Sequence, residues 1–125
     1  MELDEVTGAV IDAAILIHRR LGPGVFESVY ETVLASRLER RGLHVDRQRL
    51  VGLTFDGIRF DRAFRIDLLV DDRVIVEVKS LDQLAPTHRK QLLTYLRLMD
   101  LRVGLILNFG AATMKEGITR VVNEY

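Results

Sequence analysis

The sequence predicts an α/β fold in which helices pack against a central sheet, with the element order ααββββαββ. Two runs near the start of the chain repeat their apolar residues every three or four positions, which is typical of amphipathic helices. Residues 43–79 are rich in β-branched side chains and carry turn signals, which indicates several strands. A third helical run then separates this segment from two further strands, so the elements together predict a layered domain.

The first two predicted elements are helices. The first covers Leu3–Arg20 and ends at Gly22-Pro-Gly24. Its apolar stripe consists of Val6, Val10, Ala13 and Ile17. The second runs from about Val25 to Arg41, and Gly42 is placed to end it. Its core-facing residues are predicted to be Phe26, Val29, Tyr30, Val33, Leu34 and Leu38. The tyrosine is expected to pack in the core with its hydroxyl group reaching a partner.

Strands are predicted over most of the middle of the chain. A first strand covers Leu43–Leu53, and Asp56-Gly57 is a tight-turn signal before a second strand at Ile58. Residues 60–70 form the next strand, which breaks at an Asp-Asp pair and resumes as a β-branched strand over residues 74–79. The strands over residues 60–70 and 74–79 are expected to form an antiparallel hairpin.

A third helix follows from Pro86, which suits a first helical turn, to about Asp100. Val103–Asn108 is an apolar strand of the kind that is buried on both faces. Ile118–Val122 completes the predicted sheet as an edge strand.

Length and composition indicate one domain, 1–125, without disulfides. The chain has 125 residues, 48% of them hydrophobic, and no linker-like segment. It lacks cysteine, and its acidic start does not resemble a signal peptide, so we expect a cytoplasmic protein. No apolar run is long enough to cross a membrane. Because 18 basic residues balance 18 acidic ones, nucleic-acid binding would depend on local patches.

The residues that could carry chemistry lie on two predicted strands. In Glu77-Val78-Lys79 the two-residue period of a strand places the acid and the base on one face. Burying charges in so apolar a strand costs free energy, which indicates that these charges serve a function. Asp67 joins Glu77 on that face only if a three-residue loop, Asp71–Arg73, pairs Val70 with Val74. A hard cation such as Mg²⁺ or Mn²⁺ would then offset the repulsion between the two facing carboxylates.

Asp67 followed by Glu77-Val-Lys79 resembles the PD-(D/E)XK nuclease superfamily. Gly24-Val-Phe-Glu27-Ser-Val-Tyr30 is similar to the signature of the GxxExxY proteins, a small prokaryotic family within it. The resemblance covers about residues 10–110 and implies a restriction-endonuclease-like αβββαβ core with a mixed central sheet flanked by helices. Ile66 stands where the superfamily usually has proline.

The resemblance also implies roles for individual residues. Asp67, Glu77 and Glu27 would be metal ligands for Mg²⁺ or Mn²⁺, Lys79 the catalytic lysine, and Gln91 a helix residue of the site. Gln91 and Tyr95 share a helix face and could bind substrate. Without the resemblance, it is equally plausible that they are only polar residues at the border of the helix's apolar face. His88 lies on the same face and could also touch substrate. The three histidines have no metal-ligand spacing among them, and His18 and His44 are expected at the surface.

Two main functions remain open at the level of sequence. The resemblance implies a Mg²⁺-dependent nuclease, a phosphodiesterase that acts on DNA in preference to RNA, and a homodimer would let two sites cut both strands. The alternative is a non-catalytic nuclease-like module that binds nucleic acid or a protein. Keeping charged residues in an apolar strand favours the enzyme, since a scaffold would gain stability from apolar replacements. A third reading, a dimerisation domain, rests on the apolar strand over residues 103–107.

Overall fold

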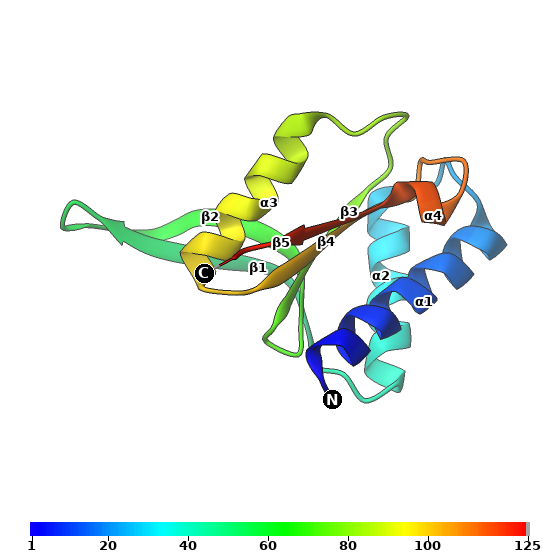
Figure 1. Ribbon diagram of the computed structural model, residues 1–125, viewed down its shortest axis with the longest axis horizontal. Helices are drawn as coiled ribbons and strands as arrows, with labels where there is room; N and C mark the ends of the chain where they lie inside the picture. The colour runs from blue at the N-terminus through cyan, green and yellow to red at the C-terminus, as the bar shows by residue number, and fades with distance from the viewer. Residues whose placement is uncertain (125) are drawn as a thin grey trace.

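The computed structural model describes residues 1–124 and contains one mixed five-stranded sheet with helices on both faces (Figure 1). The strands lie in chain order, as β1 (Val45–Phe55), β2 (Ile58–Val70), β3 (Val74–Lys79), β4 (Val103–Asn108) and β5 (Ile118–Val122). Neighbouring strands are antiparallel except β3 and β4, which are parallel because α3 (Pro86–Met99) connects them as a crossover. The predicted α/β class and mixed sheet are confirmed. The segment from α2 to β4 has the expected αβββαβ order.

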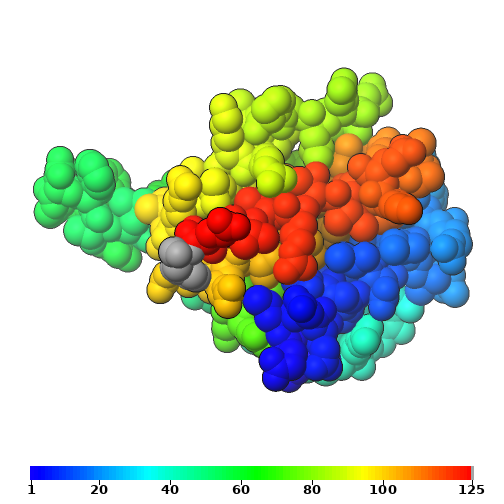
Figure 2. All heavy atoms as spheres, in the orientation of Figure 1, coloured from blue at the N-terminus to red at the C-terminus, as the bar shows by residue number. Residues whose placement is uncertain are grey.

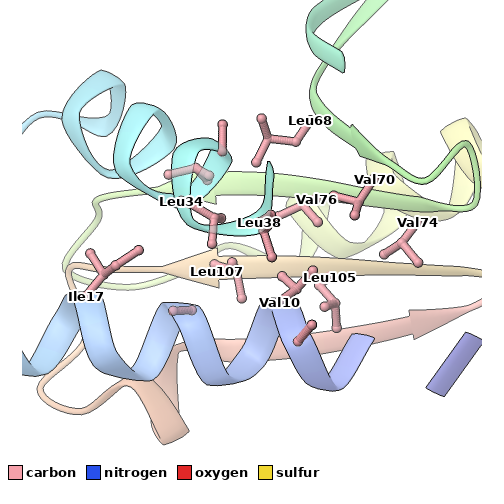
Figure 3. Packing of buried hydrophobic residues seen from close by; sticks show 14 of the residues in the cluster. Val10, Ile17, Leu34, Leu38, Leu68, Val70, Val74, Val76, Leu105 and Leu107 are labelled. Carbon is pink, nitrogen blue, oxygen red and sulfur yellow. The ribbon is translucent and has the colours of Figure 1, made fainter. Parts of the chain in front are cut away.

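Helices cover the two faces of the sheet unequally. On one face, α1 (Leu3–Leu21) and α2 (Glu27–Arg40) pack over the larger core cluster. Figure 3 shows this packing, in which Val10, Ile17, Leu34 and Leu38 lie over Val76, Leu105 and Leu107 of the sheet. On the other face α3 covers a smaller cluster with Leu92 and Leu96. Strands β3 and β4 therefore run through the interior, with side chains buried on both faces.

The strand β4 is buried along its whole length, as predicted. It lies between β3 and β5 and has a helix layer on each side. The reading of this strand as a dimerisation surface is therefore wrong, because its side chains already pack within the chain. The strand β5, with one sheet neighbour, is the predicted edge strand.

The second helix buries a different stripe from the one predicted. Phe26 and Val29 are 82% and 40% exposed, so their assignment to the core is wrong. The helix begins only at Glu27, and its buried residues are Tyr30, Glu31, Leu34, Ala35 and Leu38. This stripe is rotated by about one residue, roughly 100°, from the expected one.

Tyr30 packs in the core with its hydroxyl group bonded, as predicted. Its ring is fully buried and stacks on Phe109, with 4.3 Å between ring centroids. The hydroxyl donates to the Gly22 carbonyl oxygen at 2.5 Å and accepts from the Val25 N–H at 3.1 Å. The tyrosine therefore holds the α1–α2 connection and, with it, the start of α2.

Two features of the element order differ from the prediction. Three strands rather than four precede α3, because Ile58–Val70 is one continuous strand. Pairing with β1 continues through the predicted break, since Ile58 and Phe60 pair with Phe55 and Leu53. A short helix, α4 (Met114–Gly117), was not predicted, and Thr113 caps it by accepting the Glu116 N–H at 3.2 Å.

The expectation that His18 lies at the surface is wrong. Its side chain is buried on α1, stacks against Phe109, and places Nε2 2.8 Å from the Ala111 carbonyl oxygen. It therefore ties α1 to the loop after β4. None of the helices in residues 1–124 combines the length and apolar character that crossing a bilayer requires.

Candidate metal centre

The register of β2 and β3 brings Asp67 opposite Glu77. Their connection is the three-residue loop Asp71–Arg73, and Val70 pairs with Val74, as the hypothesis of a shared face requires. Both aspartates of this loop adopt left-handed backbone conformations, with φ of 57° and 55°. The ladder continues to Leu68 opposite Val76, which places Asp67 at the level of Glu77. The predicted loop and register are confirmed.

At Asp67 and Glu77, the backbone N–H groups of the two strands donate to carboxyl oxygens of the neighbouring strand instead of to its carbonyl oxygens. The Asp67 N–H donates to Oε2 of Glu77 at 3.1 Å. In the other direction, the Val78 N–H donates to Oδ2 of Asp67 at 2.8 Å. Each carboxyl group is thus held by the backbone of the neighbouring strand, and the last regular pair of the two strands is Leu68 with Val76. Two acids from adjacent strands therefore share one site.

The surroundings of Glu77 disfavour its ionised form. Its side chain is only 6% exposed, and burial followed by the charge of Asp67 raises its pKa to about 8. The charge of Lys79 acts in the opposite direction and lowers this pKa. The raised pKa shows that ionising the second of two neighbouring acids is unfavourable. A cation bound between them would neutralise their charge and favour the ionised form.

Helix α3 contributes Tyr95 to this electrostatic environment. Burial and then the charges of Glu77 and Asp67 raise the pKa of its hydroxyl group, so Tyr95 lies near both acids. Its ring stacks on Phe64 of β2, with 4.2 Å between ring centroids. Stacking fixes the ring beside the strand that carries Asp67.

A polar network around the buried Glu31, which the sequence did not predict, lies on the other side of Asp67. Glu31, which is 5% exposed, accepts hydrogen bonds from Arg47 Nη2 at 2.9 Å and from Gln48 Nε2 at 2.5 Å. The same amide nitrogen of Gln48 lies 3.4 Å from Oδ1 of Asp67, a weak contact. An acid beside Tyr30 on a buried helical stripe is a usable sequence signal for Glu31. The strand pattern around Gln48 contains no such signal.

The backbone at Gln48 deforms to make these contacts. Its φ of 50° is left-handed, which costs a residue with a side chain roughly 1–3 kcal/mol. The flanking residues Arg47 and Arg49 pair with Leu68 and Ile66, so the deformation is confined to the level of Asp67. The β2 strand is irregular there too, since Ile66 and Leu69 both join the cluster under α3 although they are three residues apart. Both strands are therefore distorted where the acids meet.

The other predicted site residues lie around this pair. Glu27 is exposed at the start of α2, and its Oε2 accepts the Ser80 N–H at 3.1 Å, one residue beyond Lys79. Gln91 is exposed on α3, one turn before Tyr95, and its side chain forms no hydrogen bond with any residue from 1 to 124. His88 is half-buried, and its Nδ1 accepts the Ala85 N–H at 3.1 Å, which caps α3.

The donor set of the acid pair fits a hard divalent cation. Oε2 of Glu77 and Oδ2 of Asp67 are held by backbone N–H groups, which orients the other oxygen of each carboxyl group. No fully buried side-chain oxygen or nitrogen in the described chain lacks a partner, so Oε1 of Glu77, which has none, is reachable from solvent. Mg²⁺ is commonly bound through one or two carboxylates together with waters and substrate phosphates. Asp67 and Glu77 therefore suffice as protein ligands.

A different group has the tightest spacing of ligand atoms. His44, Asp46 and Asp72 place one atom each within 4.8 Å of one another, and they are the single trio within residues 1–124 that does so. Glu27 consequently does not complete such a trio with Asp67 and Glu77. The His44 group lies at the surface, and Arg49 already pairs with Asp46 at 2.8 Å. Sequence spacing missed this acidic group because Asp72 comes from another loop.

Removal of the Arg47 side chain is expected to destabilise the protein. Arg47→Ala would leave the Glu31 carboxylate in the interior with Gln48 as its remaining partner, and we expect the free energy of unfolding to fall by about 2 kcal/mol. Urea denaturation measures this change. The exposed Arg40→Ala variant is the control and should change stability by less than about 0.5 kcal/mol. Adding Glu31→Gln to Arg47→Ala should recover part of the loss, and no recovery would contradict a buried charge as the cause.

Comparison with known proteins places the chain in a family. The family model described as PD-(D/E)XK nuclease superfamily matches residues 4–121, which is nearly the whole chain. No curated protein and no solved structure matches the chain.

Proposed function

This chain belongs to the PD-(D/E)XK nuclease superfamily, and from that premise we propose that it is a divalent-metal-dependent nuclease that hydrolyses phosphodiester bonds of DNA. The observation that carries the proposal is the pair of carboxyl groups on β2 and β3, Asp67 and Glu77, each held by a backbone N–H of the neighbouring strand, with Lys79 beside them. A strongly raised pKa beside a second charged group, as at Glu77, is typical of acids at functional sites.

Each residue has a proposed role. Asp67 and Glu77 are the metal ligands, and Glu27 is a third acidic residue at the end of β3, bonded to Ser80. Mg²⁺ or Mn²⁺, when bound, would lower the pKa of a water molecule and neutralise charge on the phosphate. Tyr95 and Gln91 on α3 are proposed to bind substrate. His88 shares the helix face, but its ring already caps α3, so its contribution to substrate binding is the least supported of the three.

Lys79 is proposed to orient the attacking water and the phosphate. Its ammonium group has three N–H donors and carries the positive charge that acts on Glu77. In the reaction, the water oxygen bonds to phosphorus and the ester P–O bond breaks. One water proton ends on the departing ester oxygen, which becomes a hydroxyl group, and the other stays with the phosphate monoester. The product is a phosphate monoester and a free hydroxyl. A positioned cation stabilises the charge that builds on the phosphate oxygens.

The finer predictions belong to the same proposal. The GxxExxY assignment rests on the segment from Gly24 to Tyr30, and DNA is the proposed substrate in preference to RNA. A single domain over 1–125, a homodimer and a cytoplasmic location also stay predictions. The alternative function, a non-catalytic nuclease-like module, is the outcome against which the proposal is tested.

The direct test compares wild type with Asp67→Asn. The asparagine oxygen can still accept the Val78 N–H, but it removes one charged ligand, so the fold should be kept and metal affinity lost. Calorimetric titration with Mn²⁺ or Mg²⁺ should give binding by wild type and at least a tenfold weaker binding by the variant. Cleavage of single- and double-stranded DNA and of RNA is followed in parallel.

The outcomes separate the two functions. Metal-dependent cleavage by wild type that is lost in Asp67→Asn supports the nuclease. The exposed Asp12→Asn variant, in which the same charge is removed from α1, should bind metal and cleave as wild type does. Metal binding by wild type without cleavage of any nucleic acid would favour the non-catalytic module. If wild type binds no metal, the proposed centre is wrong.

A further inference from the structure

The hairpin of β1 and β2 extends beyond the body of the protein as an arm, defined here as residues 47–65. Figure 2 shows its tip, coloured green, projecting well clear of the other elements. All of residues 54–63 are exposed, and no residue from 46 to 63 belongs to either core cluster. The base of the arm is tied to the body, because Arg47 bonds Glu31 and Phe64 stacks on Tyr95. The tip packs against neither core cluster, and a two-stranded hairpin without such packing is marginally stable by itself. The arm therefore contributes little to the core, and its surface is available to a ligand.

One face of the arm's tip is apolar. The pairs Leu53–Phe60 and Phe55–Ile58 face each other across the two strands, so all four side chains lie on the same face. Phe55, Ile58 and Phe60 are 68%, 57% and 45% exposed. Clustered apolar side chains at a surface usually mark a binding site.

The charge of the arm is basic although that of the chain is neutral. Residues 47–65 contain five arginines and two aspartates, a net charge of +3, within a chain of net charge 0. Arg59 pairs with Asp61 at 3.3 Å. Arg62 and Arg65 are exposed and form no ion pair with any described residue. Two free guanidinium groups and an exposed apolar face on the same arm complement a polyanion that also offers flat apolar surfaces.

We propose that this arm binds nucleic acid, with Arg62 and Arg65 on backbone phosphates and the Phe55–Phe60 face against sugars and bases. Arginine and aromatic side chains in combination are the usual means of sequence-tolerant binding. The arm is continuous with the candidate centre, because β1 carries Gln48 and β2 carries Asp67. The inference therefore rests on the proposed nuclease function and names the element that holds the substrate.

The length of the arm predicts how much substrate it spans. Phe60 pairs with Leu53, and Asp67 lies at the level of Gln48, so five residues of β1 separate the two levels, which is roughly 17 Å of strand at about 3.3 Å per residue. At about 3.4 Å per nucleotide this corresponds to roughly five nucleotides between the scissile phosphate and the tip. A second copy of the chain is a less suitable occupant, because a two-fold axis through the apolar face would bring the two basic arms together.

The test measures binding without metal, so that cleavage plays no part. Fluorescence anisotropy follows a labelled DNA duplex of about 30 base pairs, in EDTA and over a series of salt concentrations. The Arg62→Ala/Arg65→Ala variant should bind more weakly than wild type. The slope of log K against log salt should become shallower by about two, one for each lost phosphate contact. The Arg40→Ala/Arg41→Ala variant removes the same charge from the exposed end of α2 and should leave the slope unchanged.

The apolar face is tested by Phe55→Ser/Phe60→Ser, with circular dichroism to check the fold. We expect roughly a tenfold or greater loss of affinity for a labelled single DNA strand of about 30 nucleotides, whose bases are free to contact the rings. Equal binding by wild type and both arm variants would overturn the proposal. So would equal losses in the arm and control arginine variants. A serine variant that keeps DNA affinity but turns a dimer into a monomer, seen by light scattering, would show instead that the face joins two copies.

The same data separate this inference from the nuclease function. If wild type cleaves nothing but binds DNA through the arm, the arm proposal holds and the nuclease proposal fails. If metal-dependent cleavage is lost in Asp67→Asn while the arm variants bind as wild type does, the centre holds and the arm proposal fails.

Discussion

Glu77→Gln is expected to make the metal-free protein more stable than wild type at pH 8–9, and to abolish metal binding and cleavage. The side chain keeps an oxygen that can accept the Asp67 N–H, so the strand contact survives. What the variant removes is a carboxyl group that burial and Asp67 hold largely uncharged below a pKa of about 8. The acid thus opposes folding when it is ionised and becomes useful when a cation is present.

The pH dependence follows from the direction of this pKa shift. In the unfolded chain Glu77 loses its proton near the ordinary value of 4.5, whereas in the folded protein it keeps the proton to about pH 8. Between these values the folded state binds more protons, so the free energy of unfolding of wild type falls as pH rises from about 4.5 to 8. The full effect is on the order of 3–5 kcal/mol. Above pH 8 this contribution stays lost, and below pH 4.5 it is fully present.

Urea denaturation of both proteins in EDTA at pH 5, 7 and 9 checks this prediction. The difference in stability between Glu77→Gln and wild type should be small at pH 5 and grow with pH. Mn²⁺ should stabilise wild type, more so at higher pH because the metal competes with the Glu77 proton, and should leave the variant unchanged. A difference that is the same at all three pH values would sink the assignment of a raised pKa to Glu77.

Lys79→Met is expected to lower the rate of DNA cleavage by about 10²–10⁴ while metal binding is retained. The methionine keeps the bulk of the lysine side chain but removes the charge and the N–H donors that are proposed to orient water and phosphate. Because the Lys79 charge lowers the pKa of Glu77, its removal should also raise that pKa further. Metal binding should then require a higher pH than in wild type.

Single-turnover cleavage and metal titrations at several pH values measure both effects. A merely structural role for Lys79 would change stability without moving the pH dependence of metal binding. Lys115→Met, at an exposed position in α4, is the matched control and should behave as wild type. Cleavage at the wild-type rate by Lys79→Met would remove the lysine from the proposed mechanism.

Local patterns in the sequence determined most of the secondary structure. Apolar period and turn residues predict α1, α3, β4 and β5 to within a residue or two, because these elements bury a single stripe or a continuous apolar run. The sequence also determined the pairing register of Asp67 and Glu77. The two-residue period of a strand and a loop of three residues leave only one register that puts both acids on one face, and the structure has that register.

Tertiary structure decided what local patterns cannot encode. Glu31, Gln48 and Asp67 come from three separate elements, and no spacing within the chain announces that they meet. The left-handed backbone at Gln48 is a strain that only the surrounding contacts can hold in place. Similarly, the raised pKa of Glu77 depends on how deeply packing buries it, and the tip of the arm is exposed because no other element within residues 1–124 packs against it. Sequence period specifies which face a side chain lies on, whereas packing in three dimensions specifies what that face meets.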